Sequence, residues 1–119
     1  MGDCIFCKIA NNKLPANKIL ENDEFIAFHD INPVANIHVL VIPKKHIETY
    51  MDVTEADFPL VGRLHGFAQQ VASKLGVAEN GFRLINNCRA DGGQVVYHIH
   101  YHLLAGEKLP FGKNQARPE

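Results

Sequence analysis

The sequence predicts an α+β fold in which a five-stranded antiparallel meander is accompanied by two to three helices. Short apolar and β-branched runs predict the strands, short turns separate most of them, and one longer segment has the spacing of an amphipathic helix. A chain of 119 residues with 46% hydrophobic content can build one modest core. We therefore expect one domain over residues 1–106 and a polar, extended C-terminal tail over 107–119.

The first expected elements are a short helix and a pair of strands. Asp3 can cap a helix over residues 4–10, and Pro15 lies beyond its expected end. Strands over residues 18–21 and 25–29 would then pair through the polar turn that separates them.

A buried strand and the long helix come next. Residues 37–42 are apolar and largely β-branched except for His38, and Pro43 ends the run. Residues 57–75 place apolar side chains at helical spacing, with the first residue as N-cap and Gly76 as the C-terminal cap. Two strands, over residues 82–86 and 95–104, complete the expected sheet.

Three histidines alternate along the last expected strand. In an extended strand, successive side chains point to opposite faces, so His98, His100 and His102 would share one face and the intervening residues the core face. Neighbouring imidazoles would stand about 6 to 7 Å apart. Because three cations so close would repel, at least one ring should be neutral near pH 7 and able to act as nucleophile, base or metal ligand.

These residues allow three interpretations. The histidines could be hydrogen-bonded core residues, although three on one face are costly to satisfy. Two of them could hold a catalytic zinc with a third ligand from elsewhere, such as Asp91. The third interpretation is a phosphate site, because residues 91–94 read Asp-Gly-Gly-Gln just before the strand and glycines let backbone N–H groups approach an anion.

Composition excludes several classes of partner. The formal net charge is −1 and like charges do not cluster, so we expect neither a nucleic-acid partner nor an anionic membrane surface. We see no signal-peptide pattern and no apolar stretch long enough to span a bilayer, so a cytoplasmic protein is the default expectation. The odd number of cysteines, without a secretory signal, argues against a disulfide framework. On its own, the Cys4–Cys7 pair is compatible with zinc, redox chemistry or two buried thiols.

Five stretches of the chain match one known pattern: His98 to Leu104, Cys4 to Ile9, Phe28 to Pro33, His38 to His46, and Asn87 with residues 91–94. Through them the chain closely resembles the histidine-triad superfamily, and within it the Hint branch of nucleotide-binding proteins. The resemblance implies a homodimer whose sheets join into one, and hydrolysis of purine nucleoside 5′-phosphoramidates such as AMP conjugates. It also leaves open a dinucleoside polyphosphate hydrolase, or a nucleotide-binding adaptor with residual activity.

The same resemblance assigns roles to the polar residues. His100 would attack the α-phosphorus from a solvent-facing pocket, and His102 would contact the phosphoryl oxygens and assist proton transfer to the leaving amine. His38 would complete the catalytic cluster and His98 would organise the strand. The phosphate and sugar edge would be held by Asn87, Gly93 and Gln94.

A nucleoside pocket is also implied, formed by Phe6, Phe28, His29, Asp30, Ile31, Leu40 and Val96. Asp30 would accept hydrogen bonds from the ribose hydroxyls. Each aromatic or leucine could instead be ordinary core, and Asp30 could instead cap a turn before Asn32.

The resemblance further implies a structural zinc and no catalytic cofactor. In many bacterial relatives the ligands match Cys4, Cys7, His46 and His98, which would make a tetrahedral site. The chain departs from the Hint pattern at Val95, where a serine usually contacts the leaving group, and in the tail, which has no tryptophan.

Overall fold

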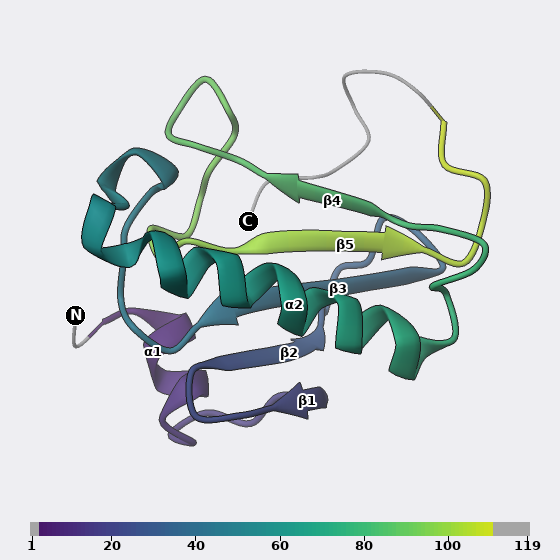
Figure 1. Cartoon of the computed structure of the whole chain (residues 1–119), viewed down its shortest axis with the longest axis horizontal. Coiled ribbons are helices and arrows are strands. Elements are labelled where there is room, and N and C mark those ends of the chain that lie inside the picture. The colour runs from purple at the N-terminus through teal and green to yellow at the C-terminus, as the bar shows by residue number, and fades with distance from the viewer. Residues whose placement is uncertain (1–2, 111–119) are drawn as a thin grey trace.

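The strands of the protein form one antiparallel sheet in a computed structural model that describes residues 3–110 (Figure 1). The sheet order is β1-β2-β3-β5-β4, and every neighbouring pair is antiparallel. The α+β class and the five strands are therefore confirmed. The tail predicted over 107–119 lies outside the described residues from 111 onwards. The strand bounds are β1 Lys18–Glu21, β2 Phe25–His29, β3 Ile37–Pro43, β4 Arg83–Asn86 and β5 Tyr101–Ala105.

Only the first three strands follow a simple meander. After β3 the chain crosses through the long helix to β4 at the sheet edge, and β5 then returns to lie between β3 and β4. In this register Leu40 of β3 faces His102 of β5, and His38 faces Leu104. The two strands that carry site histidines are therefore direct neighbours.

Two α-helices accompany the sheet. In α1 (Ile5–Ala10) the N-cap is Cys4, whose Sγ accepts the Cys7 N–H, so the predicted cap at Asp3 is wrong by one residue. The long helix α2 (Phe58–Leu75) ends as predicted at Gly76, which has a left-handed φ of 75°. Short 3₁₀ turns at Tyr50–Asp52 and Glu55–Asp57 precede it. Among the described residues, neither helix combines the length and apolarity needed to span a membrane.

Alternating side chains divide the sheet into two buried faces. On the face covered by α2, a core cluster includes Val39, Tyr101 and Leu103. On the opposite face, a second cluster joins Phe6 of α1 to β2 and β3 side chains such as Leu40. All three histidines of the triad lie on this second face, where Phe6 of α1 contacts two of them. Helix α1 therefore covers the part of the sheet where the chemistry is expected.

The predicted strand over 95–104 is wrong in its first half, because β5 begins only at Tyr101. The antiparallel register would bring Ile99 opposite Pro43, which has no N–H and cannot continue the ladder. Instead the Ile99 N–H donates to the Ile47 carbonyl at 2.6 Å. Ile99 still packs in the core with Leu103, so the predicted alternation of faces holds even without strand pairing.

Candidate active site

Four histidines gather on the α1 side of the sheet, and all four are buried. His98 and His102 are 0% exposed, His100 is 1% exposed and His38 is 2% exposed. The predicted solvent-facing position of His100 is therefore wrong for this structure. The rings of His100 and His102 lie 5.2 Å apart between centroids, closer than a flat strand would place them.

A backbone contact fixes the tautomer of His100. Its Nδ1 lies 2.7 Å from the His98 carbonyl oxygen, which can only accept, so Nδ1 carries the proton. The lone pair of the neutral ring then resides on Nε2, the atom that a nucleophilic role needs. Asn86 supports this position, because its Nδ2 donates to the His100 carbonyl at 3.0 Å.

A relay of hydrogen bonds fixes the opposite tautomer in His102. The Val34 N–H donates to His38 Nδ1 at 3.1 Å, so the neutral His38 ring carries its proton on Nε2. That proton is donated to His102 Nδ1 at 2.8 Å. His102 consequently has its proton on Nε2, and this buried nitrogen makes no hydrogen bond with any residue in the described range 3–110.

Burial favours the neutral form of three of these rings. It lowers the pKa of His102 to about 4, with help from the neighbouring His100 and His38. It also lowers the pKa of His98 to about 4, with help from His46 and His100 and against the opposing effect of the Pro43 carbonyl. The pKa of His38 is also lowered by burial, while Asp30 opposes part of that effect from 3.4 Å. The expected repulsion among cations is thus avoided because the cluster holds neutral imidazoles.

A cavity of about 350 Å³ lies beside the histidines, and it brings together the predicted nucleoside pocket. Phe6 joins cavity and cluster, since its ring also meets His100 edge-on at 5.0 Å. Asp30 is placed for both of the roles expected of it, ribose contact and turn cap. It lines the cavity, and its Oδ1 accepts from the Asn32 N–H at 2.7 Å. The lining residues are Ile5, Phe6, Ile9, Pro15, Ala16, Asn17, Phe28, His29, Asp30, Ile31, Leu40 and Val96.

Three predicted phosphate-binding residues do not line that cavity. The Gln94 side chain donates to the carbonyls of Glu48 and Val96 and accepts from the Arg89 N–H. Its amide is therefore fully used in shaping the loop, and the prediction that it donates to phosphate does not fit this arrangement. Gly93 adopts a left-handed φ of 82°, and Asn87 is half-buried directly after β4; their predicted roles stay predictions.

Cys4, Cys7, His46 and His98 converge although they come from three separate segments. His98 Nδ1 lies 3.3 Å from Cys4 Sγ, 3.4 Å from Cys7 Sγ and 3.2 Å from His46 Nδ1. A tetrahedral zinc with bonds of about 2.0–2.3 Å needs ligand atoms about 3.3–3.8 Å apart, so these separations suit it. His98 Nε2–H donates to the Pro43 carbonyl at 2.7 Å, which turns the Nδ1 lone pair toward the thiols. Donor types and orientation thus fit the predicted metal.

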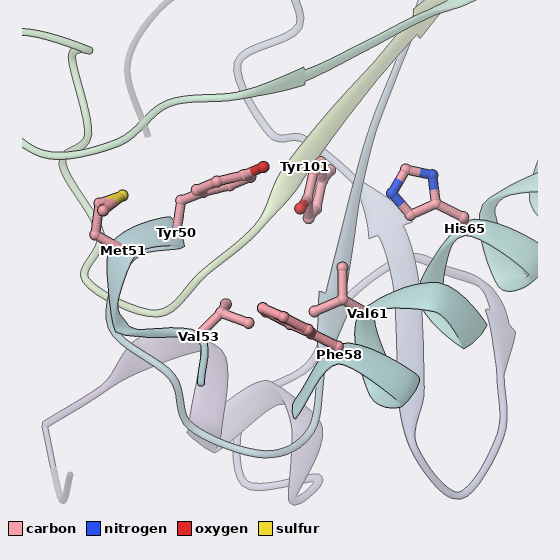
Figure 2. A pocket seen from close by; sticks show the side chains of 7 residues that line it. All are labelled: Tyr50, Met51, Val53, Phe58, Val61, His65 and Tyr101. Carbon is pink, nitrogen blue, oxygen red and sulfur yellow. The ribbon is translucent and has the colours of Figure 1, made fainter. Parts of the chain in front are cut away.

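A second cavity, of about 460 Å³, lies on the α2 side of the sheet (Figure 2). Phe58 and Val61 of α2 face Tyr50 across it, and Tyr101 of β5 stands behind them beside His65. The lining is mostly apolar, and no nucleophile with an adjacent base lies in it. This cavity is a candidate for contact with a partner rather than for chemistry.

Sequence reasoning missed several residues that shape the site. Asn86 and Pro43 position histidines through backbone contacts, and Asn17 lines the cavity from the residue before β1. Asn86 and Asn17 belong to no chemical motif, and Pro43 was used only as the end of a strand. The one available signal was Pro43, whose missing N–H marks where the pairing of β5 must stop.

Comparison with known proteins points to one family. The model of the HIT domain family matches residues 11–109. Purine nucleoside phosphoramidase of Escherichia coli (strain K12) is 42% identical over 107 residues, covering 90% of each chain. An uncharacterized HIT-like protein of Helicobacter pylori is 41% identical over 87% of this chain and 97% of its own.

Solved structures agree over almost the whole chain. A histidine triad protein from Clostridium difficile has a TM-score of 0.92 and 48% identity, covering 95% of this chain and 98% of its own. A HIT family hydrolase from Legionella pneumophila Philadelphia 1 has a TM-score of 0.89 and 44% identity, over 92% and 97%. The histidine cluster, the fold and these relatives together show that the chain belongs to the HIT domain family and is a hydrolase.

Proposed function

We propose that the protein hydrolyses purine nucleoside 5′-phosphoramidates through a nucleotidyl intermediate on His100. The observation that carries this proposal is the pair of opposite tautomers, a lone pair on His100 Nε2 beside a proton on His102 Nε2. The pair lies next to a cavity of about 350 Å³, a volume within the usual range for small-molecule sites. The phosphoramidase relative at 42% identity adds support for the substrate class.

The chemistry divides one displacement into two. His100 Nε2 attacks the α-phosphorus while His102 Nε2–H donates to a phosphoryl oxygen, the P–N bond breaks, and the leaving nitrogen takes a proton from a water beside His102. The hydroxide left from that water attacks the same phosphorus, which breaks the bond to His100 Nε2, releases the nucleoside monophosphate and restores His100. The buried His38 holds His102 in the tautomer that can donate in the first step.

The cavity would hold the nucleoside while this happens. Phe6, Phe28 and Leu40 supply apolar surface for a purine, and Asp30 offers carboxylate oxygens to ribose hydroxyls. Holding the nucleoside there would aim the α-phosphorus at the two ring nitrogens and reduce the entropic cost of reaction.

A structural zinc belongs to this proposal, held by Cys4, Cys7, His46 and His98. When bound, it would supply a cross-link between α1, the segment after β3 and the histidine segment. The reacting atoms need no catalytic cofactor in this scheme. Because the site requires reduced thiols, a reducing, cytoplasmic location suits the protein.

A homodimer is the proposed assembly. Within the described residues β4 has a strand neighbour on one side only, and next to it Tyr50, Met51 and Phe58 are 54%, 66% and 60% exposed around the second cavity (Figure 2). Pairing two β4 edges about a two-fold axis would extend the sheet and cover this apolar surface. Phe58→Asp should shift sedimentation from dimer to monomer, whereas Ile31→Asp, the same kind of change at an exposed position beside the first cavity, should leave the dimer intact.

The experiment that tests the nucleophile is intact mass after brief mixing with adenosine 5′-phosphoramidate. The wild type should show a transient addition of one AMP, and His100→Gln should show none while retaining its thermal unfolding transition. Gln is preferred to Ala because His100 is buried against Phe6 and truncation would open a cavity. An adduct that persists in His100→Gln would overturn the assignment.

The second candidate function is a dinucleoside polyphosphate hydrolase, and Val95 is the observation that favours it. Valine at this 63% exposed position cannot donate a hydrogen bond to an amine leaving group. Comparing kcat/KM for adenosine 5′-phosphoramidate and for diadenosine tetraphosphate separates the two. Turnover of neither, together with tight AMP binding, would favour the adaptor role.

A further inference from the structure

The carbonyl of His98 holds the nucleophile, and the imidazole of the same residue belongs to the cysteine–histidine cluster. His100 Nδ1–H donates to that carbonyl at 2.7 Å, while His98 Nδ1 lies 3.3 Å from Cys4 Sγ and 3.2 Å from His46 Nδ1. One buried residue therefore connects two sites that otherwise have different functions. We propose that His98 is a positioning residue, through which a metal ion bound by Cys4, Cys7, His46 and His98 fixes the orientation of His100.

Next to His98, the backbone is anchored by the Ile99 N–H and by the Asn86 side chain, which donates to the His100 carbonyl at 3.0 Å. Residues 95–100 are outside the sheet, and the His98 carbonyl accepts from a side chain instead of a neighbouring strand. The nearest backbone anchor is the bond from Ile99 N–H to the Ile47 carbonyl. The imidazole of His98 adds a side-chain anchor for its own carbonyl, because it contacts both the Pro43 carbonyl and the cluster.

A second contact leads from the cluster to the same ring. Cys4 and Cys7 flank Phe6 in α1, and the Phe6 ring packs edge-on against His100 at 5.0 Å and against His98 at 6.1 Å. Ligation of both thiols would hold α1 against these rings.

The inference rests on the proposed nucleophilic role of His100, and its mechanism is positional. Displacing a reacting group by a fraction of an ångström to an ångström costs about tenfold to a hundredfold in rate. Losing the ion should therefore lower kcat by about that factor. The nucleoside pocket is lined largely by residues outside the cluster, so AMP affinity should change by less than about threefold.

Two variants each remove one metal ligand and leave residue 98 as histidine. In Cys4→Ser the hydroxyl can still cap α1, since serine is a preferred N-cap. In His46→Gln a half-buried ring outside the catalytic cluster is replaced. Their matched controls are Cys88→Ser and His65→Gln, which make the same changes away from both sites.

Four quantities are measured on each full-length protein: zinc per chain by elemental analysis, kcat with adenosine 5′-phosphoramidate, the AMP dissociation constant, and the NMR resonance of the His100 Nδ1 proton. Both ligand variants should lose zinc, lose kcat about tenfold to a hundredfold, and broaden or shift the His100 signal. The controls should keep all four values. Adding zinc to wild type stripped by a chelator should restore kcat and the resonance together.

Several results would overturn the inference. One is a protein that takes up no zinc after purification or incubation with the metal. Another is loss of zinc with kcat and the His100 resonance unchanged. A third is a fall in AMP affinity as large as the fall in kcat, which would mean that α1 has left the pocket. If the zinc-loaded wild type does not turn over the phosphoramidate, the proposed function fails, while zinc content and the resonance still test the coupling itself.

Discussion

The imidazoles of His38 and His102 are joined by one hydrogen bond of 2.8 Å, from Nε2 of the first to Nδ1 of the second. The direction of this bond is set by the Val34 N–H, which occupies the other nitrogen of His38. As a result, the tautomer of a residue on β5 is determined by a backbone group that precedes β3. This relationship makes His38 the simplest test of the relay.

Replacing His38 with Phe should impair the chemical step. The ring volume is roughly kept, but the donor to His102 Nδ1 is lost, so His102 can adopt the tautomer with no proton on Nε2. We expect kcat for a nucleoside phosphoramidate to fall about 10- to 100-fold and KM to change by less than about threefold. Steady-state kinetics measure both. An unchanged kcat would show that the proton on His102 does not depend on His38.

Stability should decrease as the pH falls below 6.5. Burial holds the pKa of His102 at about 4 and lowers that of His38, whereas in the unfolded chain both return toward 6.5. The unfolded state therefore binds more protons between about pH 6.5 and 4, and the free energy of unfolding drops by up to about 1.4 kcal/mol per pH unit for each such histidine. Urea titrations at several pH values measure this. The His38→Phe variant should show a shallower loss, and an equal loss would contradict the attribution.

Gly92→Ala should destabilise the loop before the histidine segment. A Cβ at Gly92 would lie 2.5 Å from the backbone carbonyl oxygen and 2.7 Å from the backbone nitrogen of Cys88. Because these are backbone atoms, a side-chain rotation cannot relieve the clash. We expect a loss of about 1 kcal/mol or more in the free energy of unfolding. Gly66→Ala is the control, because nothing lies within 4 Å of its Cβ in α2, and it should stabilise by about 0.5–1 kcal/mol. Equal effects at the two positions would argue against the steric reason.

Val95→Ser tests assistance to the leaving group. The position is 63% exposed, so stability should change by less than about 0.5 kcal/mol. If a hydroxyl there reaches the leaving amine, kcat for the phosphoramidate should rise severalfold while turnover of diadenosine tetraphosphate stays constant. Parallel kinetics on the two substrates decide this, and an equal rise for both would point to an effect on the shared nucleotidyl step instead.

Local patterns predicted most of the elements. The strands at 18–21 and 25–29 have the predicted bounds, since each is a short run between clear turn residues. Gly76 ends α2 because glycine tolerates the left-handed conformation that the cap requires. The error at β5 arose because strand length depends on the partner, and Pro43 ends the ladder from the other side of the sheet.

The site was predictable in its residues but not in its hydrogen bonds. Seven residues assigned by resemblance line one cavity, including Phe28 and Asp30. The opposed tautomers of His100 and His102 depend on the His98 carbonyl and the Val34 N–H. Every residue has a backbone carbonyl, and nearly every residue has an N–H, so the sequence does not show which of these groups will contact a histidine. Gln94 shows the same limit, because its partners at Glu48 and Arg89 are fixed by a loop conformation that no motif describes.

The insertion of β5 between β3 and β4 has a consequence for how the molecule comes into being. During synthesis the first three strands can pair as they emerge, but β4 must wait for Tyr101–Ala105 before it has any neighbour. Non-local pairing of this kind is slow relative to hairpin closure. Shortened chains that end before Tyr101 should therefore expose both the α2-facing apolar side chains and an open edge, and be prone to aggregation. The strand that closes the sheet also carries His102 and directly follows His98 and His100, so the histidine cluster can form only after β5 has been synthesised.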